Sequence, residues 1–372
     1  MTKYNLIAPC IFGVEGILAD ELRRMGAEEV NAENGRVLFS GDANMIARAN
    51  INSRFAERIM LNLGTFRALT FTELFDGVKA LPLENYITVK DAFPVKGWSL
   101  NSQLHSIPDC QSIIKKACVE RLKSVYKTNW FEETGPVHQI QFSILKDQVT
   151  VMLDTTGHGL HKRGYRANSN SAPIKETLAA AMCDLARIYP DTVIVDPFCG
   201  SGTILIEAAL MAKKQAPGLR QHFAAERFHF VEQSVWQEER AMAMDKILPN
   251  IEFRAYGFDI DPECVKLTLE NAKKAGVEKY VSAEVRDIRD FKMLNGRMLV
   301  ITNPPYGERL LDIRAAEELY KVMGNVFKRE QGKKYYVISP HDEFEKYFGQ
   351  KPDKKRKLYN GMIKCDLNMY FK

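Results

Sequence analysis

The chain has 372 residues, of which 45% are hydrophobic and 27% are charged. This composition is typical of a folded globular protein and excludes a disordered or fibrous chain. The formal net charge of +5 is too small to establish a nucleic-acid partner by itself, so any basic surface must be local. No apolar run approaches the ~18 residues of a membrane span, and the N-terminus does not have the pattern of a secretory signal. We therefore expect a cytoplasmic protein with no membrane partner.

The cysteines indicate which kinds of stabilising site the protein lacks and in which compartment it functions. The seven cysteines are scattered along the chain and include no CxxC pair. This spacing argues against a disulfide framework and against a cysteine zinc site, and it agrees with a reducing compartment. We expect no bound metal.

The first segment has alternating strand and helix patterns. A strand is predicted at 4–9, an amphipathic helix at 13–26, a strand at 35–40, a helix at 42–51 and a strand near 57–68. A β-α-β-β-α-β order is the ferredoxin-like arrangement, which we place in a domain over 1–65.

A second α+β domain is predicted over 66–155. It contains a helix at 71–80, a strand at 87–93, a helix at 109–127, and strands at 138–144 and 149–154 joined by a turn at Lys146-Asp147. On the helix at 109–127, Ile113, Ile114, Ala117, Leu122 and Val125 form the predicted inward face. The outward face carries the basic residues Lys115, Lys116, Arg121, Lys123 and Lys127. This stripe is either an ordinary solvated face or a surface that contacts phosphates.

Residues 156–173 have the composition of a linker, and the remaining chain, 174–372, has the pattern of an α/β domain. An apolar helix is predicted from 174 to about 188. Strands are predicted at 192–198, 257–261, 281–287, 297–303 and 333–339, with helices between them and an insertion at 212–252. Two closing strands, about 354–360 and 363–371, flank a turn at Asn360-Gly361. This order predicts a Rossmann-like, mostly parallel seven-stranded sheet with an antiparallel edge.

Four polar motifs follow predicted strands of this domain. The first is DPFCGSGT (196–203), which leaves one buried strand and enters a helix, with glycines that allow a ligand to approach the backbone. Asp259 and Asp287 follow the next two strands. Ligands bind open α/β sheets at the carboxyl ends of their strands, and an acidic residue there suits ribose hydroxyls. Taken singly, each aspartate is more often a helix cap or a turn residue.

The fourth motif is Asn303-Pro304-Pro305-Tyr306. Two prolines stiffen the turn, so that the Asn303 side-chain carbonyl and the Pro304 main-chain carbonyl are held as acceptors for an exocyclic amino group. Tyr306 offers a ring on which a flipped base can stack. The four motifs together favour methyl transfer to a planar nitrogen.

Over 165–372 the sequence resembles class I S-adenosylmethionine-dependent methyltransferases, and NPPY resembles the motif of enzymes that methylate planar nitrogens. NPPYGERL, DPFCGSGT and RGYR…APIKETLAAAM (163–182) together resemble the THUMP-domain RNA guanine-N2 methyltransferases, of which the bacterial 23S rRNA L type is the most similar. The resemblance covers the whole chain. It implies a ferredoxin-like domain, a THUMP domain at 66–155 and a methyltransferase domain.

The resemblance also implies functional residues. Asn303 to Tyr306 would hold the guanine amino group. S-adenosyl-L-methionine would bind in the first motif and beside the two strand-end aspartates, with Thr177 and its neighbours closing over it. The cofactor residues implied are Asp196, Phe198, Cys199, Gly200, Ser201, Gly202, Thr203, Asp259, Ile260, Asp287, Ile288 and Thr177.

RNA is the implied partner, with 23S rRNA as the main substrate and tRNA as the second. The expected RNA-binding residues are Lys115, Lys116, Lys123, Lys127, Arg163, Arg166 and Arg309. Adenine-N6 methylation and a non-catalytic assembly role remain open alternatives. We expect a monomer.

Overall fold

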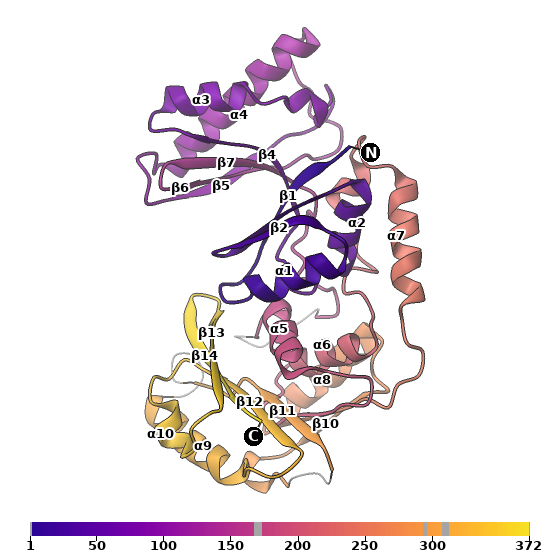
Figure 1. Cartoon of the computed structure of the whole chain (residues 1–372), viewed down its shortest axis with the longest axis vertical. Coiled ribbons are helices and arrows are strands. Elements are labelled where there is room, and N and C mark those ends of the chain that lie inside the picture. Colours follow the sequence, from indigo (N-terminus) through magenta and orange to yellow (C-terminus); the bar gives the residue numbers. More distant parts are fainter. Residues whose placement is uncertain (1, 167–172, 293–295, 307–311, 372) are drawn as a thin grey trace.

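The computed structural model describes residues 2–166, 173–292, 296–306 and 312–371. These residues form two seven-stranded sheets that follow one another along the longest axis of the molecule (Figure 1). The first sheet is built from the N-terminal part of the chain and the second from the C-terminal part.

The first part of the N-terminal sheet has the ferredoxin-like topology expected from the sequence. Its elements are β1 (Tyr4–Pro9), α1 (Glu15–Arg24), β2 (Glu28–Glu33), β3 (Arg36–Gly41), α2 (Ala43–Asn52) and β4 (Met60–Arg67). The strand order β2-β3-β1-β4 is antiparallel throughout. The side chain of Asp42 accepts a hydrogen bond from the Met45 amide and thereby caps α2.

The sheet continues without a break into the second α+β region. That region contains α3 (Phe71–Lys79), the 3₁₀ turn η1 (Leu83–Asn85), β5 (Val95–Leu100), α4 (Ile107–Tyr126), β6 (Ile140–Leu145) and β7 (Gln148–Asp154). β4 pairs with β7, so the order from β1 onward is β1-β4-β7-β6-β5. The predicted boundary between the first two domains, at 65/66, therefore falls inside β4.

The predicted strand at 87–93 is wrong. The Asp91 carboxylate accepts a hydrogen bond from the Thr88 amide, which closes a turn, and only Ala92 makes an isolated bridge, to Val137. The strand begins after Pro94, as β5. On α4, Val125 is exposed rather than packed inward. The turn at Lys146-Asp147 is confirmed, and both residues have positive φ, as a two-residue β6–β7 hairpin requires.

The second sheet has the order β10-β9-β8-β11-β12-β14-β13, in which the first five strands are parallel and the last two antiparallel. Its strands are β8 (Val193–Asp196), β9 (Arg254–Asp259), β10 (Val281–Val285), β11 (Met298–Thr302), β12 (Lys333–Ser339), β13 (Lys354–Asn360) and β14 (Ile363–Tyr370). The helices are α5 (Glu176–Ala186), α6 (Thr203–Ala212), α7 (Gln233–Asp245), α8 (Pro262–Ala275), α9 (Ile313–Val326) and α10 (Phe344–Phe348), with 3₁₀ turns η2 (Ala224–Arg227) and η3 (Ile288–Asp290).

The two halves of the molecule share one hydrophobic core, which includes buried residues of α1, α2, α5 and α6. The insertion helix α7 packs against α2, and the Arg356 guanidinium on β13 donates to the Gly13 carbonyl. The predicted linker takes part in this core, since Leu160 and Tyr165 are buried in it. Within the described residues, none of the helices combines the length and apolar character needed to cross a bilayer.

Candidate functional site

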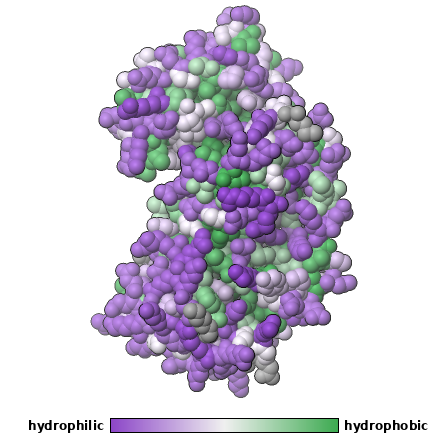
Figure 2. All heavy atoms as spheres, viewed as in Figure 1, coloured by the Kyte–Doolittle hydropathy of each residue, from purple (hydrophilic) through white to green (hydrophobic). Residues whose placement is uncertain are grey.

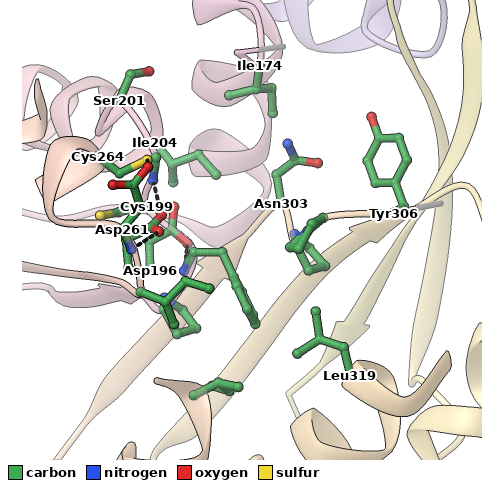
Figure 3. A pocket seen from close by; sticks show the side chains of 18 of the residues that line it. Ile174, Asp196, Cys199, Ser201, Ile204, Asp261, Cys264, Asn303, Tyr306 and Leu319 are labelled. Atoms are coloured by element: carbon green, nitrogen blue, oxygen red, sulfur yellow. Dashed lines mark hydrogen bonds between the residues drawn. The ribbon is translucent and has the colours of Figure 1, made fainter. Parts of the chain in front are cut away.

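The four predicted motifs meet at one edge of the second sheet. β10, β9, β8 and β11 are neighbours, and Asp287, Asp259, Asp196 and Asn303 follow or end them. Because these strands are parallel, their carboxyl ends lie side by side around the point where the strand order reverses. There the residues line a cavity of about 690 Å³ (Figure 3).

The glycine loop between β8 and α6 is held by side chains from neighbouring elements. The Gly200 amide donates to Asp259 Oδ2 at 3.0 Å. On α8, Thr268 Oγ1 donates to the Gly200 carbonyl at 2.9 Å and Asn271 Nδ2 donates to the Ser201 carbonyl at 3.0 Å. The backbone of the loop is therefore fixed before any ligand binds.

Gly202 has a different role from its neighbours in this loop. It has φ +77° and is absent from the described cavity lining, whereas Gly200 and Ser201 are present. A Cβ at Gly202 would lie 2.8 Å from Thr268 Cγ2, so glycine is needed for packing against α8. Packing against α8 thus accounts for the glycine at this position, and its contact with the cofactor stays a prediction.

Asp196 is buried at the base of the cavity. Its Oδ1 accepts hydrogen bonds from Thr302 Oγ1 at 2.7 Å and from the Phe198 amide at 3.1 Å. Burial raises its pKa from 3.8 to about 7, although both hydrogen bonds act in the opposite direction. Asp196 thus ties the end of β8 to the residue that precedes Asn303.

Asn303 is the polar side chain most clearly directed into the cavity. Figure 3 shows it projecting between the glycine loop on one side and Tyr306 on the other. Its Oδ1 is buried, and no described residue donates a hydrogen bond to it. Because a buried acceptor without a partner is costly, this oxygen is suited to accept from a ligand.

Tyr306 lies beside Asn303 and is positioned by the C-terminal hairpin. Its hydroxyl accepts a hydrogen bond of 2.8 Å from Asn360 Nδ2, at the end of β13. The ring is buried and lines the cavity together with Pro304 and Pro305. The hairpin therefore fixes the orientation of this ring.

Two other aspartates near strand ends stabilise a turn or a helix end and also line the cavity. Asp287 Oδ1 accepts from the Arg289 amide at 2.8 Å and its Oδ2 pairs with the Arg289 guanidinium, also at 2.8 Å. Asp261 caps α8 and also lines the cavity. Ile260 and Ile288 add apolar side chains to the same lining.

Several lining residues were not identified from the sequence. They come from the linker end, from the start of α8, from η3 and from α9: Pro173, Ile174, Cys264, Arg289, Ala315, Glu318 and Leu319. Asp312 caps α9, and an amphipathic pattern follows it in the sequence. That pattern could have identified the α9 residues as candidates for the cavity lining. Thr177 is absent from the described lining. It is fully buried, and its hydroxyl donates to Glu57 Oε1 at 2.6 Å, so it fastens α5 to the first domain instead.

The expected RNA-binding residues fall into two groups. On α4, Lys116 is exposed and Lys123 is half-buried beside Glu120 at 3.6 Å, and Lys127, the C-cap residue of α4, is also exposed. Lys115 instead lies over the Phe93 ring, 3.5 Å from its centroid, and pairs with Glu133. Its packing makes Lys115 a poor contact for phosphates.

The arginines of the linker do not face solvent, which contradicts the expectation for Arg163 and Arg166. The Arg163 side chain is 2% exposed and donates to the carbonyls of Leu160 and Arg54. Arg166 pairs with Glu176 at 2.6 Å. Arg163 thus joins the linker to the first domain and Arg166 joins it to α5, and neither guanidinium faces solvent for RNA. Arg309 lies outside the described residues.

The sequence matches known families over most of its length. The RlmL ferredoxin-like domain matches residues 5–60, the THUMP domain matches residues 68–154, and the RMKL-like methyltransferase domain matches residues 163–369. The chain belongs to the RMKL-like methyltransferase family. It is a class I methyltransferase that uses S-adenosyl-L-methionine, joined to a ferredoxin-like and a THUMP domain.

Two curated relatives illustrate the range of the family. "Putative RNA methyltransferase YpsC" of Bacillus subtilis is 42% identical over 100% of this chain and 97% of its own length. "Ribosomal RNA large subunit methyltransferase K/L" of Cellvibrio japonicus is 32% identical over 99% of this chain, which spans about half (51%) of that longer protein.

Solved structures agree with the fold and with the cofactor. SMU.472, "a putative methyltransferase complexed with SAH", has a TM-score of 0.95 and 42% identity, over 100% of this chain and 98% of its own. "A predicted N6-adenine-specific DNA methylase" from Listeria monocytogenes has a TM-score of 0.93 and 42% identity, over 100% and 97%. The names of these relatives thus differ in the substrate.

Proposed function

We propose that this protein transfers a methyl group from S-adenosyl-L-methionine to the exocyclic N2 amino group of a guanosine in RNA, with 23S rRNA as the substrate. The observation that carries the proposal is the buried Asn303 Oδ1, which lines the cavity without a described hydrogen-bond donor. An amino group on a planar base offers the two N–H donors that this oxygen and the neighbouring Pro304 carbonyl would accept.

The cavity offers suitable contacts for each part of the cofactor. The glycine loop and Asp196 would face the methionine portion. Asp259, at the end of β9, would accept from the ribose hydroxyls, and Asp287 would accept from the adenine amino group. Ile260 and Ile288 provide apolar surfaces for a planar ring.

When bound, S-adenosyl-L-methionine supplies an electrophilic methyl carbon on a sulfonium sulfur, which leaves as a neutral thioether. Asn303 Oδ1 and the Pro304 carbonyl would accept hydrogen bonds from the amino group. These bonds draw its lone pair out of the ring system and aim it at the methyl carbon. Tyr306 would stack on the flipped base. The contribution of the protein is alignment and electrostatics.

The proton of the amino group must also leave. No histidine occurs among the described residues that line the cavity. Asp196 is buried at the base, and Thr302 and the Phe198 amide already donate to it. We expect the proton to pass to solvent after the methyl group has moved.

RNA is favoured as the substrate by the front half of the molecule. The chain carries a THUMP domain, and relatives covering nearly all of it are named as RNA and ribosomal RNA methyltransferases. Exposed lysines lie on the THUMP helix α4, and the surface in Figure 2 is hollowed between the THUMP domain and the methyltransferase domain. Exposed lysines would attract the phosphates of a folded RNA.

The test is an incubation of the purified protein with radiolabelled S-adenosyl-L-methionine and total RNA from a strain that lacks it. The RNA is then separated by size and digested to nucleosides. We expect label in N2-methylguanosine from large ribosomal RNA. An Asn303→Ala variant serves as the inactive control.

Other outcomes would contradict parts of the proposal in different ways. Label in N2-methylguanosine of tRNA would replace the substrate but keep the reaction. N6-methyladenosine would contradict guanine as the base, in line with the name of the Listeria relative. Label in neither RNA nor ribosomal particles, with the cofactor still bound, would overturn RNA methylation.

A further inference from the structure

Three side chains with metal-binding atoms meet at the junction of the THUMP domain and the methyltransferase insertion. Asp91 and His138 belong to the THUMP domain, and His229 belongs to the insertion between α6 and α7. One potential ligand atom from each residue lies within 4.8 Å of the other two. None of the three lines the cofactor cavity, and the proposed methyl transfer does not use them.

His138 is the buried centre of this group. Its side chain is 1% exposed, and its ring stacks on Phe228 with 4.0 Å between centroids. Nδ1 lies 3.2 Å from the Pro136 carbonyl oxygen and 3.7 Å from Asp91 Oδ2, so the tautomer with the proton on Nδ1 donates to that carbonyl beside the Asp91 carboxylate. Nε2 then carries a lone pair, and it is buried with no hydrogen-bond partner among the described residues.

This geometry is the one that metal-binding histidines generally adopt. Such a histidine usually donates its second ring N–H to a backbone carbonyl or carboxylate, which fixes the tautomer and the ring orientation. Burial lowers the pKa of His138, which favours the neutral ring. A lone pair buried without a donor is otherwise unfavourable.

The other two residues complement His138 in different ways. Asp91 is buried, and its Oδ2 accepts a hydrogen bond from the Thr88 amide at 2.6 Å, so the carboxylate is held in place. His229 is exposed, which gives an ion a route from solvent. Its ring lies edge-on to Phe230, with 5.5 Å between centroids.

We propose that Asp91, His138 and His229 bind one divalent transition-metal ion of the zinc type. Two imidazoles and one carboxylate form a ligand set that Zn²⁺ accepts, with water as a fourth ligand, whereas Mg²⁺ and Ca²⁺ prefer oxygen ligands alone. Tetrahedral Zn²⁺ with bonds of about 2 Å requires ligand atoms roughly 3.3 Å apart. The present spacing therefore requires movements of an ångström or so on metal binding, which the exposed His229 side chain can make most easily.

The ion would link two domains that the family boundaries separate. On one side are the THUMP residues Asp91 and His138, and on the other is an insertion of the methyltransferase domain. The site therefore has a structural role: it holds the THUMP domain against the methyltransferase domain.

The test uses the full chain after treatment with a chelator and dialysis. Zn²⁺ is added, and binding is measured by competition with a chromophoric chelator, by elemental analysis and by the melting temperature. Co²⁺ replaces Zn²⁺ in a parallel sample, because its visible spectrum reports coordination geometry. The variant is His229→Ala, since an exposed residue can be removed without opening the core. The matched control is His222→Ala, in the same insertion and 92% exposed.

We expect one Zn²⁺ per chain, a higher melting temperature with Zn²⁺, and a tetrahedral Co²⁺ spectrum. His229→Ala should weaken Zn²⁺ binding by about tenfold or more and abolish the shift in melting temperature, whereas His222→Ala should change neither. Equal affinity in the wild type and His229→Ala, or no stoichiometric binding by the wild type in excess Zn²⁺, would overturn the site. The metal-free melting temperatures of the wild type and both variants should agree, which separates ligand loss from misfolding.

Discussion

Asn303 differs from the other polar residues of the cavity because its acceptor oxygen has no described donor. Replacing it with alanine should lower kcat by about 100-fold or more, as is typical when one preorganised polar contact to the reacting group is lost. The affinity for S-adenosyl-L-methionine should stay within a factor of about 2 of the wild type, because Asn303 is expected to contact the acceptor base.

The measurement is steady-state kinetics together with calorimetric titration of the cofactor. Asn303→Asp keeps an acceptor oxygen at the same place and should retain more activity than Asn303→Ala. An alanine variant with wild-type kcat would mean that this oxygen does not contact the amino group.

Among the individual site residues, those that end or follow strands could be assigned to the cavity from the sequence. Asp196, Asp259, Asp287 and Asn303 follow apolar runs, and parallel strands bring such positions together whatever the surrounding side chains are. Arg163 and Thr177 could not be placed in this way. Their surroundings depend on how one domain packs on another, and charge or polarity in a glycine-rich segment does not reveal burial.

Among the elements, the segment after the linker is fixed by a single carboxylate. Glu57, which precedes β4, accepts hydrogen bonds from Thr177 and Lys175, and it lies 3.0 Å from His161 Nδ1. Burial acts to raise the Glu57 pKa, but the hydrogen bonds and the Lys175 charge outweigh it and lower the pKa from 4.5 to about 2. Glu57→Gln should therefore destabilise the protein by about 1–3 kcal/mol at neutral pH.

The pH dependence of this effect has a definite sign. Because folding lowers the pKa of Glu57, its contribution is complete above about 4.5 and is lost as the pH falls towards 2. Urea denaturation across this range should show the difference between wild type and Glu57→Gln shrinking with falling pH. Glu238→Gln, at an exposed position of α7, should leave stability unchanged. A difference that grew towards low pH would contradict the ionised role of Glu57.

Element positions were predicted best where hydrophobic patterns were long. The strands of the second sheet and the helix α4 lie close to their predicted ranges. The strand predicted at 87–93 failed because its apolar residues enter a turn closed by a side chain, and β2 was given no range because four of its six residues are polar or charged. The local strand propensity of a segment does not reveal a hydrogen bond between a side chain and the backbone, and it does not reveal which strand an edge strand will pair with.

For the whole molecule, RNA affinity should depend on exposed charges of α4 that lie outside the cofactor cavity. Replacing Lys116 and Lys127 together with glutamine should weaken RNA binding and reduce the slope of log K against log salt by about 1.4–1.8, the value for two lost phosphate contacts. Cofactor affinity should not change. Filter binding at several salt concentrations provides the measurement.

Lys115→Gln is the matched control, because that lysine lies on the same helix but packs on Phe93 and pairs with Glu133. It should leave the salt slope unaltered. A salt slope unchanged in the double variant would place the RNA on another surface.

The three-part organisation followed from the sequence, whereas the way in which the parts join did not. No sequence pattern indicated that β4 pairs with β1 on one side and with β7 on the other. Likewise, Asp91, His138 and His229 come from three distant segments, so their meeting was invisible without the fold.

The shared strand has a practical consequence for dissecting this protein. A cut at 65/66 would leave most of β4 paired with β1 on one fragment and would separate β7, on the other fragment, from most of its partner strand, so that both fragments carry a strand edge with unpaired backbone groups. Unprotected strand edges of this kind pair with other chains and aggregate. Residues 1–154 therefore form the smallest N-terminal fragment with an intact sheet, and an isolated THUMP fragment would have to borrow a strand from elsewhere.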